Sequence, residues 1–283
     1  MSGSPSPGPG GAPGSVLLLR LAGPLQSWGS RSAFNRRETQ PEPTKSGVIG
    51  LLAAAQGLDR AAPLGDLLDL RLSVRVDVAG TLTRDYHTVS DYRGRPLLQA
   101  GVSAKLQQRP TAPAKYTHLT QRYYLQDAVF LAALSGPEET LAELARAVAE
   151  PAFPLALGRR SCPPTQPVSL GLHTGGAEDV LRTCPWQASA RARKLHAYRV
   201  ARQYEVDEPL YEETVRCSVT IERPDGDDVL HDAPVSFDPL NRAFTPRRVT
   251  RDWYGIPTGH ARSGPWPDRP DATGHDPFAF LPE

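Results

Sequence analysis

The most regular hydrophobic pattern in the chain is a strict alternation. Every second residue from 70 to 78 is Leu or Val, and the positions between them hold Arg, Ser, Arg and Asp. A period of two is typical of a β-strand with one buried and one exposed face, so we predict a half-exposed strand here. Gly80 is expected to turn the chain, after which residues 81–89 pair back as the next strand and begin a hairpin.

Other apolar segments complete an alternation of strands and helices. Residues 16–21 form an apolar run that ends at Gly23-Pro24, which predicts a buried strand. A helix is expected from about Ser46 into three alanines, a strand at 122–133, a helix from Pro137 to 149, and a last strand near Leu170. The order strand, helix, two strands, helix, strand is that of a ferredoxin-like α+β fold.

Residues 90–120 show little apolar periodicity but are rich in Arg, Lys, Gln and Tyr. A loop of this length is uncommon in a compact domain unless it has a function. A plain mobile insertion is the alternative.

Beyond Gly171 the patterns weaken. We expect strands at 195–204 and 214–222, with a turn at Asp225-Gly226. The predicted domain organisation is a disordered Pro/Gly/Ser tail, a ferredoxin-like core with an insertion at about 90–120, a smaller and mainly β region, and an extended tail; these occupy residues 1–15, 16–172, 173–255 and 256–283.

Charge is distributed unevenly along the chain. The 283 residues carry a net charge of only +1, which argues against a generic nucleic-acid-binding protein. Residues 16–123, however, contain fifteen Lys and Arg against eight Asp and Glu, whereas the rest of the chain contains seventeen against twenty-three. The basic surface is therefore expected in the first half.

Several classes are disfavoured by composition. No apolar run approaches the ~20 residues of a membrane span. The three cysteines show no CxxC spacing, so neither a metal site nor a disulfide framework is indicated, and a reducing cytoplasm fits. We expect no cofactor.

A strand, an arginine-bearing loop and a helix N-terminus follow one another in residues 16–52. Unpaired N–H groups and a partial positive charge at a helix start suit an anion, and Thr44, Lys45 and Ser46 could add donors. Arg36 and Arg37 could fork phosphates, and a neighbouring tryptophan, Trp28, could offer a flat face to a base. The alternative interpretation is that Thr44 and Ser46 are ordinary helix caps, that Trp28 belongs to the core and that the arginines are solvated. A nucleotide-binding P-loop is rejected, because prolines stand where its glycines should be.

A second candidate is the loop that begins at Gly158. Glycine lets the backbone approach a ligand closely, Arg159 and Arg160 could fork a phosphate, and Ser161 could donate a hydrogen bond. Cys162 is interpreted as a packing residue, because no base that would activate its thiol can be identified. The alternative is a surface turn with two solvated arginines.

Five short blocks, in order along the chain, resemble one family: LRLAGPLQSWG, PTKSGVIGLLAAA, RDYHTV, DYRG and LGRRSCPPTQP. They are similar to the CasD family of the RAMP superfamily, whose members are subunits of the type I-E CRISPR complex Cascade. The resemblance implies a ferredoxin-like, RRM-like core with a β-hairpin thumb, for which residues 90–120 are the natural place.

The resemblance also implies a non-catalytic role in antiviral defence. Such subunits hold the 5′ handle of crRNA, cap the filament of CasC backbone subunits and abut CasA, in a complex that also contains CasB and CasE and engages target DNA. The RNA-binding residues that it suggests are Gln26, Ser27, Trp28, Arg36, Arg37, Thr44, Lys45, Ser46, Arg93, Arg159, Arg160, Ser161 and Cys162.

An enzymatic alternative stays open, because relatives in the type I-C branch cut the repeat RNA. A metal-independent ribonuclease needs a base, an acid and a cation at one phosphate. Tyr86 and His87, with Lys45, are the nearest candidates. Adjacent residues on a strand point to opposite faces, which weakens this site.

Overall fold

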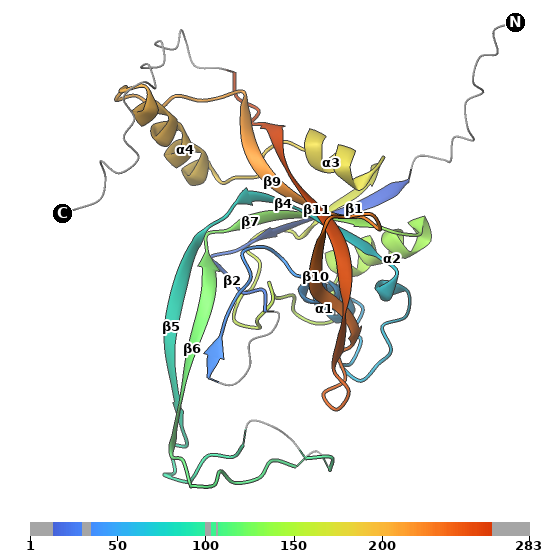
Figure 1. The fold of residues 1–283 in the computed structure, drawn as a ribbon, viewed down its shortest axis with the longest axis vertical. Coiled ribbons are helices and arrows are strands. Elements are labelled where there is room, and N and C mark those ends of the chain that lie inside the picture. The colour runs from blue at the N-terminus through green and yellow to red at the C-terminus, as the bar shows by residue number, and fades with distance from the viewer. Residues whose placement is uncertain (1–13, 30–34, 100–102, 106, 262–283) are drawn as a thin grey trace, which may run out of the picture.

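The computed structural model describes residues 14–29, 35–99, 103–105 and 107–261. Its centre is a sheet with the strand order β10-β11-β9-β4-β7-β1-β8 (Figure 1). Four of these strands form the predicted core: β1 (Ser15–Ala22), β4 (Arg71–Val78), β7 (Val129–Ser135) and β8 (Ser169–Thr174). Their order, β4-β7-β1-β8, and their antiparallel pairing are those of a ferredoxin-like sheet, so the predicted fold class is confirmed.

The core helices are α1 (Lys45–Ala55) and α2 (Glu138–Ala149). Both begin and end close to their predicted bounds. Apolar residues of the two helices join alternate residues of β1, β4 and β7 in one buried cluster, among them Leu19, Ile49, Phe130 and Leu144. A short 3-10 helix, Gly65–Leu68, precedes β4.

The C-terminal region extends the same sheet. It contributes β9 (Thr214–Glu222), β10 (Asp228–Ser236) and β11 (Ala243–Pro257), and β9 pairs with β4. The sheet therefore runs across the boundary expected at residue 172. The strand predicted at 214–222 and the turn at Asp225-Gly226 are confirmed, since the N–H of Gly226 donates to the carbonyl of Arg223.

The prediction that β4 is half-exposed is wrong. Its polar residues Ser73, Arg75 and Asp77 are buried. Arg75 pairs with Asp77 at 2.6 Å and donates to the carbonyl oxygens of Leu181 and Cys184, at the end of α3 (Ala177–Thr183). A charged pair can be buried when every donor finds a partner, and here the C-terminal region supplies the partners.

The expected strand at 195–204 is also wrong, because this segment lies in the helix α4 (Ala190–Gln203). Ser189 caps it by accepting from the N–H of Ala192. Ala197, Val200 and Ala201, spaced three or four residues apart, are its buried residues. The C-terminal region therefore contains the helices α3 and α4 beside its three long strands.

A second, smaller sheet forms the projecting hairpin in Figure 1. Its arms are β5 (Thr81–Ser90) and β6 (Thr117–Gln126), joined by a tip at 91–116. The prediction that 81–89 pairs back on the preceding strand is wrong: among the described strands, β5 pairs with β6 and not with β4. The single strand predicted at 122–133 is divided by Asp127, which has a positive φ of 56°, into β6 and β7.

The other edge of β6 carries two short strands, β2 (Leu25–Gln26) and β3 (Arg36–Arg37). The predicted tails lie almost wholly outside the described residues, in 1–13 and 262–283. Among the helices in the described ranges, none is both long and apolar enough to cross a membrane.

Candidate RNA interface

The N-terminus of α1 already holds an anion, and that anion belongs to the protein. Thr44 caps the helix by accepting from the N–H of Gly47 at 3.2 Å. The backbone N–H of Lys45 donates to Oδ2 of Asp232 at 2.7 Å, and its Nζ pairs with Glu222 at 2.7 Å. The predicted chemistry of the helix start is therefore present, but a carboxylate from β10 occupies it.

Asp232 is part of a buried ion network. Arg247 donates to both of its carboxylate oxygens, at 2.6 and 3.0 Å, and to Glu222 at 3.2 Å. Burial by itself lowers the pKa of the Arg247 guanidinium, but the hydrogen bonds and charge of Asp232 hold that pKa above its ordinary value. Two cations and two carboxylates balance one another here, so the charge of Lys45 is already neutralised, and Ser46 is buried.

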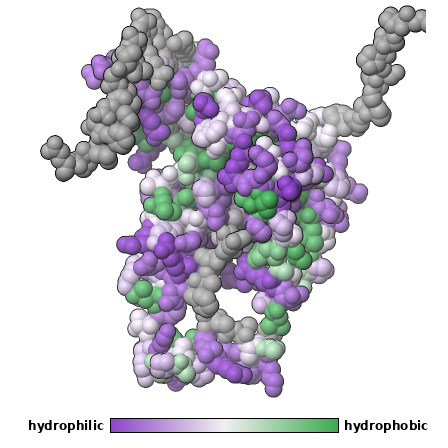
Figure 2. Space-filling model, in the orientation of Figure 1, coloured by the Kyte–Doolittle hydropathy of each residue, from purple (hydrophilic) through white to green (hydrophobic). Residues whose placement is uncertain are grey.

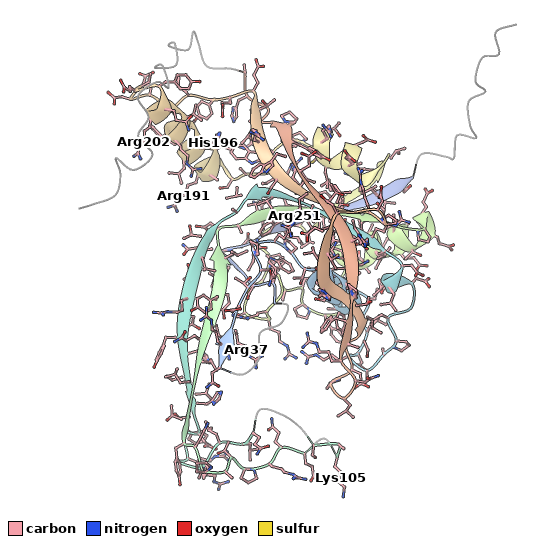
Figure 3. All side chains as sticks on the ribbon, viewed as in Figure 1. Arg37, Lys105, Arg191, His196, Arg202 and Arg251 are labelled. Atoms are coloured by element: carbon pink, nitrogen blue, oxygen red, sulfur yellow. The ribbon has the colours of Figure 1, made fainter. Side chains whose placement is uncertain are left out.

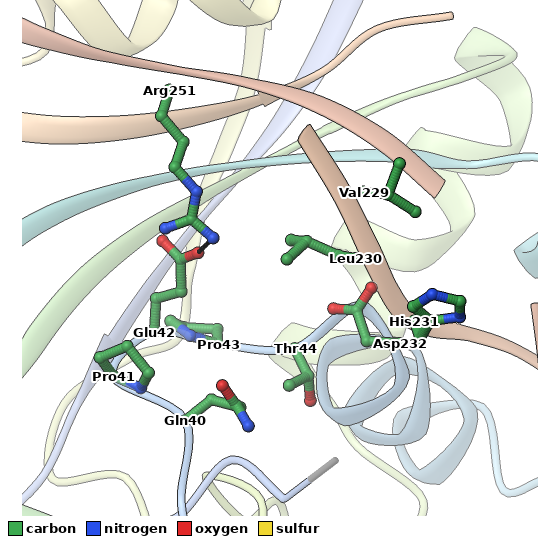
Figure 4. Close-up of a pocket in the computed structure, with 10 residues that line it drawn as sticks. All are labelled: Gln40, Pro41, Glu42, Pro43, Thr44, Val229, Leu230, His231, Asp232 and Arg251. Atoms are coloured by element: carbon green, nitrogen blue, oxygen red, sulfur yellow. Dashed lines mark ion pairs between the residues drawn. The ribbon is translucent and has the colours of Figure 1, made fainter. Parts of the chain in front are cut away.

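A cavity of about 290 Å³ borders this network, between residues 40–44 and β10 (Figure 4). Glu42 and Asp232 both line it. Arg251 pairs with Glu42 across 3.4 Å, as the dashed line in the figure marks. Two carboxylates in the wall make this cavity unfavourable for a phosphate.

The prediction that Trp28 offers an aromatic face is wrong. Its side chain is fully buried and packs against Gly47 in the first turn of α1. Nε1 of Trp28 donates to Oε1 of Gln26 at 3.1 Å, and Nε2 of Gln26 donates to the carbonyls of Leu21 and Ala128. The alternative of a core tryptophan is confirmed, and Gln26 serves the same core.

The two predicted loops nevertheless meet. Gly158 has a φ of +85°, and a Cβ on it would lie 1.9 Å from the carbonyl oxygen of Ser27. The N–H of Ser27 donates to Leu157, and its Oγ donates to the carbonyl of Tyr123 on β6. Only glycine fits this approach, which fixes the 157–162 loop against the base of the hairpin.

Arg159 fastens this junction. Its guanidinium donates to the carbonyls of Tyr123 at 3.2 Å and Arg37 at 2.7 Å, and it lies over the ring of Tyr124 at 4.8 Å from the centroid. Its hydrogen bonds therefore connect the loop, β3 and β6. Arg160 beside it is exposed and points its charge to solvent.

Ser161 and Cys162 also differ in their exposure to solvent. Ser161 is exposed, with its Oγ 3.5 Å from the hydroxyl of Tyr124. Cys162 is fully buried, and burial raises the pKa of its thiol, so it packs as expected and is no nucleophile. Arg36 on β3 is exposed, pairs with Glu38 at 2.8 Å and lies over the ring of Tyr123.

The hairpin carries a clear excess of positive charge. Residues 81–126 contain seven Lys and Arg against two Asp, whereas the other 237 residues contain twenty-five against twenty-nine Asp and Glu. The hairpin therefore has a net charge of +5, and the rest of the chain has a net charge of −4. Of its cations only Arg122 is half-buried; the exposed ones are Arg84, Arg93, Arg95, Lys105, Arg109 and Lys115.

Aromatic side chains are interspersed with these charges. Tyr86, Tyr92 and Tyr116 are 60%, 94% and 56% exposed. Arg93 donates to both carboxylate oxygens of Asp91, and these hydrogen bonds lower the pKa of that carboxyl to about 2. Exposed cations with aromatic rings between them are typical of surfaces that bind single-stranded nucleic acid.

Arg37 lies on β3 beside the hairpin, and Lys105 lies on its tip (Figure 3). In the space-filling view an opening separates the hairpin side of the molecule from the side that carries β10 and β11 (Figure 2). The basic composition and missing periodicity of 90–120 had indicated a functional insertion. The sequence-predicted site contained only Arg93 from it.

No group of three or more His, Cys, Asp or Glu side chains in the described ranges is arranged to hold a metal ion.

Comparisons with known proteins agree with this architecture. Residues 16–250 match the family described as CRISPR-associated protein (Cas_Cas5). The CRISPR system Cascade subunit CasD of Escherichia coli (strain K12) is 39% identical over 175 residues, which cover 56% of this chain and 70% of CasD.

Two solved structures are similar over 86% of this chain. One belongs to a CRISPR RNA-guided surveillance complex, with a TM-score of 0.65 and 32% identity over 92% of that chain. The other is described as a crystal structure of a Cas protein, with a TM-score of 0.59 and 33% identity over 96% of that chain.

Proposed function

The chain belongs to the CRISPR-associated Cas5 family, and from this premise we propose that it is a non-catalytic, crRNA-binding subunit of a type I-E Cascade complex. It holds the 5′ handle of crRNA at the junction of the hairpin and the 157–162 loop. It caps the CasC filament and abuts CasA, in an assembly completed by CasB and CasE that recognises target DNA.

The observation that carries this proposal is the concentration of unburied positive charge on the hairpin. RNA carries one phosphate per nucleotide, and Lys and Arg that neutralise phosphates release bound counterions, which favours binding. The adjoining junction adds Arg36, Arg160 and Ser161, all exposed. Backbone contacts from these groups, with stacking on the exposed tyrosines, suit a single-stranded handle.

The same geometry disfavours the repeat-cutting endoribonuclease. Lys45, its expected cation, is buried and paired with Glu222. Tyr86 and His87 are neighbours on a regular stretch of β5, so their side chains leave opposite faces of the strand. Incubation of the purified protein with repeat RNA in EDTA tests this: intact RNA is expected, and one defined cut would favour the enzyme.

The proposal is tested by co-purification. The tagged chain is expressed with the other Cascade subunits and a CRISPR array, and the RNA that accompanies it is sequenced. We expect crRNAs with one uniform 5′ end in a complex of fixed stoichiometry. Recovery of the chain without RNA and without partners would refute the proposed role.

The hairpin's part is tested by removing charge from its tip. Replacing Arg95, Lys105, Arg109 and Lys115 by Gln should weaken binding of handle RNA and reduce the slope of log Kobs against log salt by up to about 2.8, at about 0.7 per phosphate contact. The matched control replaces four exposed arginines elsewhere by Gln: Arg60, Arg71, Arg146 and Arg242. Equal slopes for the two variants would argue against the hairpin.

A further inference from the structure

The helix α4 presents an exposed face that the proposed handle site does not use. The residues of this face recur along the helix at spacings of three and four, which places them on one side of it. They are Arg191, Lys194, Leu195, Tyr198, Arg199 and Arg202, all of them exposed. We refer to these six residues as the outer face of α4.

The charges of the outer face are of one sign and uncompensated. Among the described residues, Arg191, Lys194, Arg199 and Arg202 form no ion pair, and α4 contains no acidic residue. Nζ of Lys194 lies 5.9 Å from the ring centroid of Tyr198. Lys and Arg clustered along one side of a helix are the electrostatic footprint of a surface that binds nucleic acid.

The inner side of α4 is firmly held. Arg193 donates to the carbonyls of Trp186, Ala188 and Thr258, and His196 pairs with Glu212 at 2.9 Å. The five acidic residues of 205–213 follow the helix in a segment that packs against this inner side, where the N–H of Leu210 donates to the carbonyl of Ala197. These contacts of α4 come from Arg193, His196 and Ala197, and none of them uses a residue of the outer face.

From this geometry we infer that the outer face of α4 binds the phosphate backbone of duplex DNA. Arg191 and Arg202 are eleven residues apart, or about 16 Å along a helix, and duplex DNA carries a charge about every 1.7 Å of its axis. A row of cations on a rigid rod matches that continuous line of charge. Single-stranded RNA would call for stacking platforms, and the outer face has only Tyr198.

A protein partner fits the outer face less well. The centre of a protein–protein interface is depleted of charged residues as a class, although arginine and tyrosine are enriched at interfaces. Here charged residues outnumber apolar ones by four to two, and they flank Leu195 and Tyr198 along the whole helix. Charge complementarity therefore selects the polyphosphate.

The position of α4 identifies which nucleic acid it meets. The helix and the hairpin tip lie near opposite ends of the long axis of the molecule (Figure 1). If the hairpin holds crRNA, which this step takes from the proposed function, α4 meets a different strand. The inference is that α4 contacts the double-stranded part of the DNA that the assembled complex recognises.

The experiment uses the assembled complex, in which crRNA occupies the handle site. Arg191, Lys194, Arg199 and Arg202 are replaced together by Gln, which has a helix propensity close to that of Arg and Lys. The Arg60, Arg71, Arg146 and Arg242 variant removes the same charge elsewhere. Binding of a labelled DNA duplex without a target sequence is titrated at several salt concentrations, and RNA content and stoichiometry are measured for each complex.

We expect the α4 variant to assemble with a full complement of crRNA but to bind the duplex at least about tenfold more weakly, with a salt slope reduced by up to about 3.6. The control variant should match the unaltered complex. Unchanged duplex binding by a correctly assembled α4 variant would overturn the inference and leave the proposed function standing. Loss of a subunit from that variant would overturn it too, because α4 would then be a protein contact. Failure of the unaltered chain to assemble would instead refute the proposed function.

Discussion

The N-terminus of α1 and the β5–β6 hairpin both carry the cations expected of a phosphate site, but their surroundings differ. At α1, Lys45 and the helix N–H groups face Asp232 and Glu222, which come from strands almost two hundred residues later in the chain. On the hairpin, six of seven cations are exposed, and Asp91 is the carboxylate that pairs with one of them.

The difference shows that a local pattern predicts the preference of a site but not its occupant. A helix start attracts an anion wherever it lies, and the fold decides whether that anion is a ligand or the protein's own carboxylate. A long basic insertion cannot bury its charges without partners, so it has to expose them.

The largest effect is expected from breaking the network at α1. Replacing Asp232 by Ala leaves Arg247 buried without its main partner and the helix start without its anion, which should lower the free energy of unfolding by about 3–5 kcal/mol. Urea denaturation measures this. Replacing the exposed Asp228 by Ala, as a control, should change the free energy of unfolding little. A comparable loss in both variants would mean that the buried network contributes no more to stability than an exposed carboxylate does.

A smaller loss of stability is expected where the 157–162 loop meets the hairpin base. Gly158→Ala places a Cβ against the carbonyl of Ser27 and strains a positive φ, so its cost should exceed that of Gly94→Ala, which has a φ of +67° but open space around it. The excess is the overpacking term, about 1–3 kcal/mol. Thermal unfolding of both variants gives the comparison, and equal losses would contradict the close approach.

The adjacent arginines of this loop should separate stability from binding. Arg159→Ala removes hydrogen bonds to the carbonyls of Tyr123 and Arg37 and should cost about 1–2 kcal/mol of unfolding free energy. Arg160→Ala should leave stability unchanged and reduce the salt slope of handle-RNA binding by about 0.7, for one phosphate contact. The opposite assignment of effects would show that Arg159 is the RNA ligand and Arg160 the structural residue.

The ferredoxin-like core could be predicted from the sequence because its signals are local. Alternation, caps and helix-breaking prolines placed α1, α2, β8 and β9 near their true bounds. The incorrect predictions concern features that depend on distant partners. The polar face of β4, for example, is buried because α3 packs on it. The strand predicted at 195–204 was wrong because the buried residues Ala197, Val200 and Ala201 recur at the spacing of a helix and not at the period of two of a strand.

In the candidate site, too, the predictions from local signals differ from the features that depend on distant partners. The Gly158 loop and the hairpin could be chosen as candidates from the sequence, since glycine next to arginines and a basic insertion are local features; that they bind RNA stays a prediction. Trp28 could not be placed that way, because its burial depends on Gly47 and on the hydrogen bonds of Gln26. The sequence also gave no sign that Asp232 would fill the helix start.

The most direct test of the account is a map of crosslinks between the assembled complex and crRNA that carries photoreactive uridines in its 5′ handle. The crosslinked peptides, identified by mass spectrometry, should come from the hairpin, residues 81–126, and from the 157–162 loop. Peptides from residues 44–52 should be absent, because the first turn of α1 is buried with its own counter-ions. Crosslinks concentrated in 44–52, with none on the hairpin, would contradict the account.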